Sequence, residues 1–180
     1  MIPEKFKEVI HSVTESREYR SMKQFRHHIG STAYRHSIKV AYLCYLHCEK
    51  HGKNCRNTEL LRGALLHDFY LYDCHAKGAR LRHCTKHPRI ALENAQKIYP
   101  DLSETERDII KHHMFPVTPV PPHTREGWIV CMYDKVATIS DCISGIAEKG
   151  RRSRIFRSIM LAKSAMAEKK NKGKCTGGKT

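Results

Sequence analysis

Apolar residues recur at helical spacing along most of this chain, and no stretch of useful length alternates between apolar and polar residues as a half-buried strand would. Near the N-terminus, Phe6, Val9, Ile10 and Val13 fall on one helical face. This periodicity predicts an all-α protein. Because the chain has 180 residues, it can bury one sizeable core, whereas two independent domains would be a tight fit.

Caps and helix breakers divide the pattern into separate helices. Thr58 is an N-cap residue at the start of one apolar run, and Pro88 suits the first turn of another helix. Ser103 and Glu106 have the spacing of a capping box. Four prolines in residues 115–122 predict a loop. The expected helical segments are 3–25 (one or two helices), 31–50, 58–68, 88–99, 103–114 and 128–148.

The net charge of +15 is unevenly distributed. Residues 151–180 hold ten Lys and Arg against a single acid, Glu168, so this segment contributes +9 of the total. From residue 169 onward the chain is rich in Lys and Gly and low in apolar residues, which predicts a basic, disordered tail. We therefore expect one helical domain over residues 1–168, followed by a tail at 169–180. Nucleic-acid binding through the basic segment is an alternative function, but this distribution does not favour it.

The sequence has no apolar run approaching the roughly 20 residues that a membrane helix needs, and its first residues contain no apolar signal region. None of the eight cysteines forms a CxxC pair, so we expect reduced thiols rather than a disulfide framework. These features predict a cytoplasmic protein without a membrane partner.

Several His and Asp residues occur where a polar side chain is unexpected. His67 and Asp68 directly follow the apolar run GALL, and Asp134 lies inside the apolar segment WIVCMYDKVATI. A carboxylate buried there is costly unless a cation or strong hydrogen bonds compensate it. Because neighbours on a helix point about 100° apart, His67 and Asp68 can flank one point in space. Imidazoles and carboxylates together suit Zn, Fe, Mn or similar divalent ions.

His36, the sequence LLHD at 65–68 and Asp134 together resemble the H…HD…D signature of the HD-domain metal-dependent phosphohydrolase superfamily. The resemblance covers about residues 28–145. It implies a compact HD-domain-like helical bundle. It also implies that a metal-activated water cleaves a phosphoester or phosphoanhydride bond of a nucleotide or a similar small phosphorylated substrate.

The resemblance further implies the roles of individual residues. Asp68 and His67 would be catalytic, and Asp68 would bridge two divalent ions (Fe, Mn or Zn). His87 and His113 resemble the extra ligands of the binuclear subset, such as bacterial HD hydrolases that cleave dinucleoside tetraphosphates. His113 is preferred over His112 because, in relatives with a single histidine here, the ligand ends the apolar helix immediately before a loop, as in HHMFP of this chain. The complete expected ligand set is His36, His67, Asp68, His87, His113 and Asp134.

Two features leave alternatives open. Many relatives continue the dipeptide as HD-x-[GA]-K, whereas this chain reads HDFYLYD and lacks that lysine. A basic run near His87 is either a solvated face or a phosphate-binding surface. A di-iron oxidase or oxygenase could also use the same ligands. The candidate substrate-binding residues are Arg80, Arg82, Lys86, Arg89 and His112.

Overall fold

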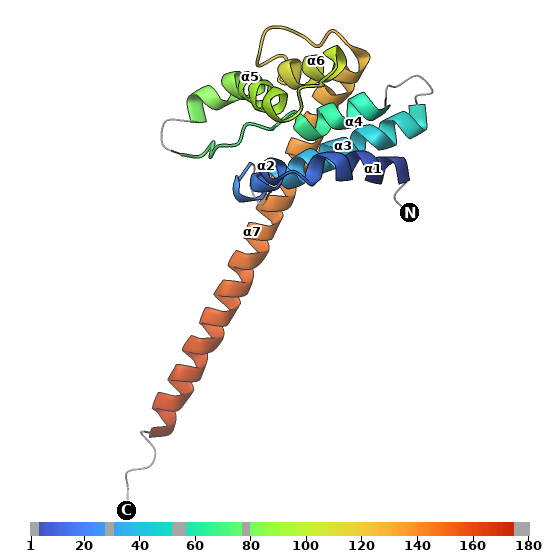
Figure 1. Cartoon of the computed structure of the whole chain (residues 1–180). Helices are drawn as coiled ribbons and strands as arrows, with labels where there is room; N and C mark the ends of the chain where they lie inside the picture. Colours follow the sequence, from blue (N-terminus) through green and yellow to red (C-terminus); the bar gives the residue numbers. More distant parts are fainter. Residues whose placement is uncertain (1–3, 28–30, 52–56, 77–79, 175–180) are drawn as a thin grey trace, which may run out of the picture. The chain divides into compact units, whose positions relative to one another are not determined.

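The computed structural model describes the backbone of residues 4–27, 31–51, 57–76 and 80–174, and their side chains except those of residues 5, 57, 80–82, 150 and 152–174. Within this part of the chain every regular element is a helix, and the only strand-like pairing is an isolated bridge between Arg26 and Thr32. The predicted all-α fold is therefore confirmed (Figure 1). The elements are α1 (Glu4–Thr14), α2 (Arg17–Ser21), the 3-10 helix η1 (Met22–Gln24), α3 (Ala33–His51), α4 (Asn57–Leu66), α5 (Arg80–Ile98), α6 (Glu104–His112) and α7 (Arg125–Lys174).

The chain divides into two compact units, Met1–Cys142 and Ile143–Thr180, and α7 contributes to both. This boundary lies earlier than the expected one at residue 168. By its backbone, the stretch 169–174 of the expected tail belongs to α7, and residues 175–180 lie outside the described part of the chain. Disorder of the tail therefore stays a prediction. No helix in the described part is long and apolar enough to cross a membrane.

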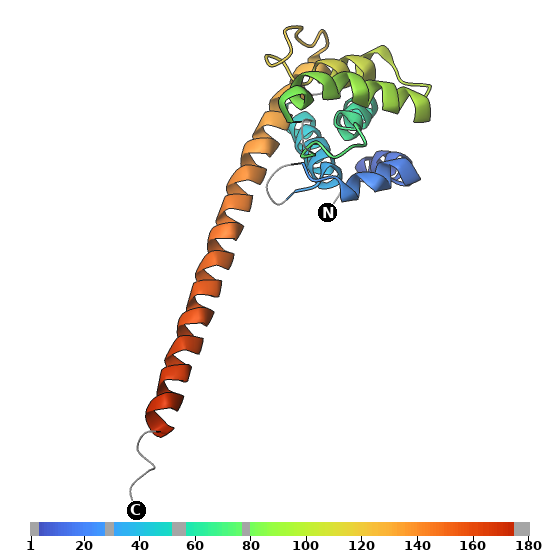
Figure 2. The same cartoon turned by 90° about the vertical axis from the view of Figure 1, so that its left-hand side faces the viewer.

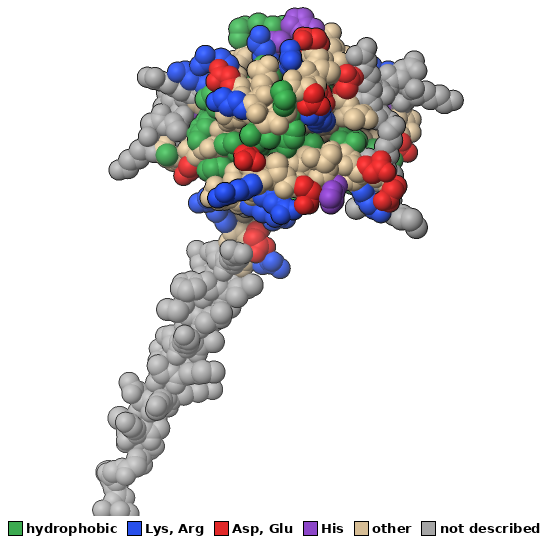
Figure 3. Space-filling view, viewed as in Figure 1, with side chains coloured by type: hydrophobic (Ala, Val, Ile, Leu, Met, Phe, Trp, Pro, Cys, Tyr) green, Lys and Arg blue, Asp and Glu red, His purple; other side chains and the backbone are tan. Residues whose placement is uncertain are grey.

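Helix α4 is the centre of the first unit. It packs against α1, α3 and α6, and the views in Figures 1 and 2 show it among these helices. Its apolar residues Leu60, Leu61, Ala64, Leu65 and Leu66 are all at most 2% exposed. On the face of the protein seen in Figure 3, charged side chains surround a band of apolar side chains. The segment that follows α4 therefore starts from the most buried helix of the unit.

Local sequence signals explain most helix boundaries. The predicted capping box of α6 is present: Ser103 Oγ accepts from the Glu106 backbone N–H at 3.2 Å, and the Glu106 carboxylate accepts from the Ser103 N–H at 2.8 Å. Helix α7 begins at Arg125, where Thr124 Oγ1 accepts from the Gly127 N–H. The predicted 115–122 loop is also confirmed, since no helix lies between α6 and α7.

The prediction that Pro88 begins a helix was wrong, because α5 starts at Arg80 and contains Pro88 in its interior. Tertiary contacts support the turn that precedes the proline. The Nδ1 atom of His83 lies 2.8 Å from the Tyr72 hydroxyl, and the His83 ring stacks on His87 at a centroid distance of 4.5 Å. These contacts outweigh the local preference for a helix start at proline.

Gly63 allows α4 and α6 to approach each other closely. A Cβ atom at this position would lie 2.6 Å from Cδ1 and 3.1 Å from Cβ of Ile109, which is fully buried. Overpacking costs about 1–3 kcal/mol and helix propensity returns about 1 kcal/mol, so we expect Gly63→Ala to lower the free energy of unfolding by up to about 2 kcal/mol. Urea unfolding measures the change.

The matched variant is Gly63→Ala combined with Ile109→Val, which removes the Cδ1 atom. This second change should recover part of the lost stability, although Ile109→Val alone should cost about 0.5–1.5 kcal/mol. A Gly63→Ala protein as stable as the wild type would contradict this account of the packing.

Candidate metal centre

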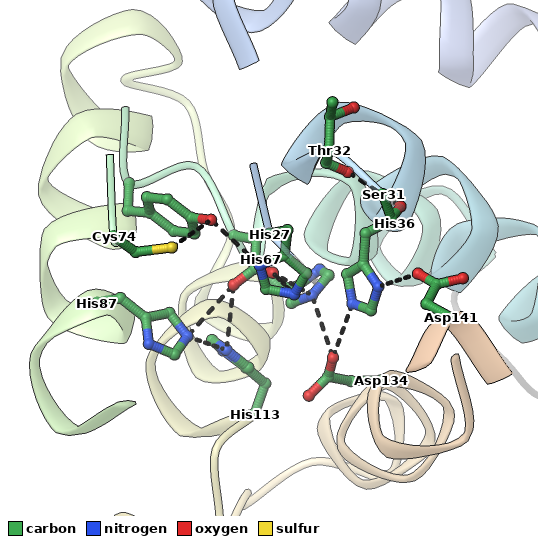
Figure 4. A network of polar contacts seen from close by, with 12 residues as sticks. His27, Ser31, Thr32, His36, His67, Cys74, His87, His113, Asp134 and Asp141 are labelled. Carbon is green, nitrogen blue, oxygen red and sulfur yellow. Dashed lines mark hydrogen bonds and ion pairs between the residues drawn. The ribbon is translucent and has the colours of Figure 1, made fainter. Parts of the chain in front are cut away.

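The six residues expected as metal ligands lie together in the first unit, and none is more than 6% exposed. They come from elements that are far apart in the sequence and converge at the end of α4 (Figure 4). They are His36 on α3, His67 and Asp68 directly after α4, His87 on α5, His113 at the end of α6 and Asp134 on α7.

The two oxygens of Asp68 face different pairs of imidazoles. Oδ1 lies 3.2 Å from His87 Nε2 and 3.7 Å from His113 Nε2. Oδ2 lies 3.4 Å from His67 Nε2 and 3.2 Å from His27 Nε2. His87 Nε2 and His113 Nε2 are 2.9 Å apart. The carboxylate of Asp68 thus stands between two groups of nitrogen atoms.

A second carboxylate, Asp134, lies beside the imidazole of His67 on the Oδ2 side of Asp68. Its Oδ1 atom lies 3.0 Å from His36 Nε2 and 3.6 Å from His67 Nε2, and Figure 4 shows both imidazoles directed toward it. His67 is therefore placed between the two carboxylates.

The other ring nitrogen, Nδ1, fixes three of the imidazoles through a local hydrogen bond. In each case Nδ1–H donates to a backbone carbonyl three or four residues earlier, which directs Nε2 toward the carboxylates. The pairs are His67 with Ala64 at 2.7 Å, His87 with His83 at 3.0 Å, and His113 with Ile110 at 2.8 Å.

The two remaining imidazoles use side-chain partners that the sequence prediction missed. His36 Nδ1–H donates to Asp141 Oδ2 at 3.1 Å, and Asp141 in turn accepts from Lys39 Nζ at 2.7 Å. His27 Nδ1 lies 3.1 Å from the Tyr70 hydroxyl. Asp141 follows Asp134 by seven residues, two turns along the same helix face, and this spacing could have identified it. His27 lies between helices, where no periodic signal marks it.

The imidazoles favour the ionised form of both carboxylates. Burial alone would raise the pKa of Asp68, but His67 and His27 outweigh burial and hold this pKa well below its usual range. Burial also opposes ionisation of Asp134, yet His36 and His67 hold its pKa well below the usual range. The centre therefore contains two buried negative charges that need compensation.

The surroundings shift the pKa values of His67 and His113 in opposite directions. Burial by itself lowers the pKa of His67, but Asp68 and Asp134 raise it to about 10. Burial, together with His67 and His87, lowers the pKa of His113 to about 3. His113 is therefore a neutral imidazole near pH 7, which is the form that binds a metal.

Buried polar atoms at this centre are incompletely hydrogen-bonded. Among the described residues, His67 Nε2 and Asp68 Oδ2 are buried and make no hydrogen bond of good geometry, although they lie 3.4 Å apart as an ion pair; such incomplete satisfaction is costly in a protein interior. Three overlapping sets of ligand atoms each lie within 4.8 Å of one another: His27–His36–Asp68, His36–His67–Asp134 and His67–Asp68–His113. The residues present therefore fit a divalent metal, and imidazoles with carboxylates suit Zn, Fe or Mn.

His112 belongs to a different cluster from its neighbour His113. Its Nδ1–H donates to Asp108 Oδ1 at 2.8 Å, and Asp108 also accepts from the backbone N–H groups of His123 and Thr124. Asp108 thus holds the start of α7 against α6. The structure does not bring His112 to the centre as a substrate-binding residue.

Two residues of the basic run, Lys86 and Arg89, can be placed, and neither lines the cavity at the centre. Lys86 and Arg89 are exposed, and Arg89 pairs with Glu93 at 3.7 Å. Both match the alternative of a solvated face. The side chains of Arg80 and Arg82 lie outside the described residues.

A cavity of about 480 Å³ reaches the centre, and Asp68, His87, His113 and Asp134 are among its lining residues. The ligand atoms are therefore buried within the protein but accessible to a small molecule.

A protein-family model described as HD domain matches residues 33–139, which is more than half of the chain. The matched segment contains all six expected ligands but neither His27 nor Asp141. No curated protein and no solved structure gives a significant match.

Replacing both His87 and His113 by Ala tests whether Asp68 bridges two ions. Because both imidazoles face Asp68 Oδ1, their loss should lower the bound metal from two ions to about one per chain, while the helical circular dichroism persists. Elemental analysis of protein purified without added metal provides the measurement. His11 and His51, both exposed, provide a matched double-alanine control that should keep the full metal content. Unchanged metal in the His87/His113 variant would exclude a second ion at this position.

Proposed function

The chain belongs to the HD-domain family, and from this premise we propose that it is a metal-dependent phosphohydrolase acting on a small phosphorylated substrate, such as a nucleotide. The observation that carries this proposal is the position of Asp68, whose two oxygens face two groups of imidazoles. One buried carboxylate in this arrangement suits a bridge between two divalent ions.

The proposed ligands divide between the two sides of Asp68. His36, His67, Asp68 and Asp134 would hold one ion, and Asp68, His87 and His113 would hold the second. His27 lies beside Asp68 Oδ2 and adds an imidazole on the first side. Asp141 and Tyr70 would act indirectly, by orienting the rings of His36 and His27.

Divalent ions in such a centre lower the pKa of a coordinated water toward neutrality and neutralise phosphate oxygens. The protein itself positions the ligand side chains and limits the access of bulk water to them. The Nδ1 hydrogen bonds keep the Nε2 atoms directed at the carboxylates, and burial excludes bulk water except through the cavity. In the overall reaction, a water oxygen forms a bond to phosphorus and the phosphorus–oxygen bond to the leaving group breaks.

Asp68→Asn tests this function most directly. The substitution keeps the size of the side chain but removes its charge, and an amide is a poor bridge between two cations. We expect loss of at least one ion and a fall in hydrolysis rate of several orders of magnitude, because unactivated water has a pKa of about 15.7 against about 7 in a favourable metal site. Metal analysis and phosphate release from a nucleotide panel measure both effects.

Asp108→Asn is the matched control, since Asp108 is another buried carboxylate of the same unit but lies in the α6–α7 cluster. It should lower the melting temperature through lost charge-assisted hydrogen bonds while keeping the metal content and the rate per folded molecule. Wild-type metal content and hydrolysis in Asp68→Asn would refute the metallohydrolase proposal. Equal rates in air and under argon would also argue against an oxygen-dependent reaction.

A further inference from the structure

The cavity that reaches the proposed metal centre is lined by two chemically different groups of residues. The buried group, here called the inner end, consists of proposed ligands, including Asp68, His87 and His113, and the more exposed residues form the outer wall. The cavity volume of about 480 Å³ lies in the range typical of small-molecule sites. A substrate with its phosphoryl group at the inner end must therefore place the rest of the molecule against the outer walls.

Much of the outer wall is apolar, and it comes from three separate segments. Met114 and Val117 lie in the loop between α6 and α7, Cys84 lies on α5 and Ile139 on α7. Val117 is 52% exposed and Ile139 is 60% exposed, so both present apolar surface that a ligand could cover. Removing such surface from water favours an apolar ligand group.

The same walls offer little positive charge. Within the described lining, Lys135 is the single Lys or Arg residue. Its ammonium group donates to the backbone carbonyls of His113 at 3.1 Å and Cys131 at 3.0 Å, and to Cys131 Sγ at 3.2 Å. A lysine has three N–H donors, so all of them are directed at protein atoms. Lys86 and Arg89, from the basic run, do not line this cavity.

From the apolar outer wall and the absence of an available Lys or Arg in the described lining, we infer that the substrate is a phosphate monoester with an apolar leaving group, such as a simple aryl group without a sugar. The inference rests on the proposed function, because it places the single phosphoryl group at the metal centre. The leaving group then contacts Met114, Val117 and Ile139. A nucleoside triphosphate or a dinucleoside tetraphosphate carries further negative charges, for which the described lining away from the proposed metal ions provides no available Lys or Arg.

The reaction is a hydrolysis and needs no further reactant. The water oxygen bonds to phosphorus, the bond from phosphorus to the ester oxygen breaks, and one proton from water ends on that ester oxygen. The products are a neutral alcohol or phenol and inorganic phosphate.

The first test compares kcat/KM of the metal-containing protein for 1-naphthyl phosphate, glycerol 3-phosphate, AMP, ATP and diadenosine tetraphosphate. We expect 1-naphthyl phosphate to exceed each of the others by about tenfold or more, since even one methylene group in an apolar pocket can contribute about 10- to 200-fold. A binding measurement supplements the rates. In calorimetric titrations, 1-naphthylmethylphosphonate should bind about tenfold or more tightly than methylphosphonate.

A matched pair of variants tests whether the outer wall causes the preference for an apolar leaving group. Val117→Asn makes the wall polar without adding charge, and it should reduce both preferences by about tenfold. Val120→Asn makes the same change in the same loop at a residue that is 44% exposed and does not line the cavity. The Val120→Asn protein should keep the preference for 1-naphthyl phosphate in kcat/KM and the preference for 1-naphthylmethylphosphonate in binding. Because both side chains are partly exposed, both variants should fold, and thermal unfolding checks this.

The outcomes separate the inference from the proposed function. Absence of turnover for every compound would refute the phosphohydrolase proposal and this inference with it. Turnover without a preference for 1-naphthyl phosphate over the other four compounds would overturn the inference alone. A Val117→Asn protein that keeps the wild-type preference in both rate and binding would also overturn it.

Discussion

Two carboxylates buried among imidazoles are the constraint on which the rest of this structure depends. Asp68 and Asp134 are almost inaccessible to water, and five histidine rings face them. Isolated buried carboxylates would be strongly destabilising, so the surrounding helices must supply compensating groups. Helices α3 and α5 and the end of α6 contribute His36, His87 and His113 to this compensation. The need to neutralise these charges connects the fold to the proposed metal chemistry.

Packing and local hydrogen bonds together give the centre its geometry. Helix α4 carries five apolar residues that are at most 2% exposed and ends where His67 and Asp68 begin, and Gly63 lets α6 approach it closely. The histidine rings are then oriented through Nδ1, mostly by carbonyl groups of their own helical turns. Such bonds require only helical geometry and cost little side-chain freedom beyond one rotamer. The position of each ring therefore comes from helix packing, and its direction comes from a local hydrogen bond.

The two carboxylate clusters of the first unit show how similar residue types serve different purposes. Asp108 accepts hydrogen bonds from two backbone N–H groups, from Thr124 Oγ1 and from His112, so its charge is satisfied within the protein. Asp68 instead faces imidazole nitrogens, and its Oδ2 atom, 3.2 Å from His27 Nε2 and 3.4 Å from His67 Nε2, makes no hydrogen bond of good geometry among the described residues. A carboxylate whose hydrogen bonds are made within the protein stabilises a loop, whereas a carboxylate with incomplete hydrogen bonds beside several imidazoles is suited to bind a cation. Hydrogen-bond satisfaction, more than composition, distinguishes these two sites.

The sequence by itself determined the all-α class and the capping box at Ser103, because periodicity and capping can be read along the chain. It also indicated the six residues that meet at the centre, four through the H…HD…D signature and His87 and His113 through the resemblance to the binuclear subset. It did not determine that His27 and Asp141 join that centre, that α5 extends through Pro88, or that Lys86 and Arg89 lie away from the cavity. Nor could the sequence decide by physical argument alone whether His112 or His113 faces the centre, since adjacent residues at a helix end point in different directions. Tertiary structure decided these points because they depend on which distant segments pack against α4. Contacts between segments many residues apart follow from side-chain volume and burial in three dimensions, which local helical signals do not encode.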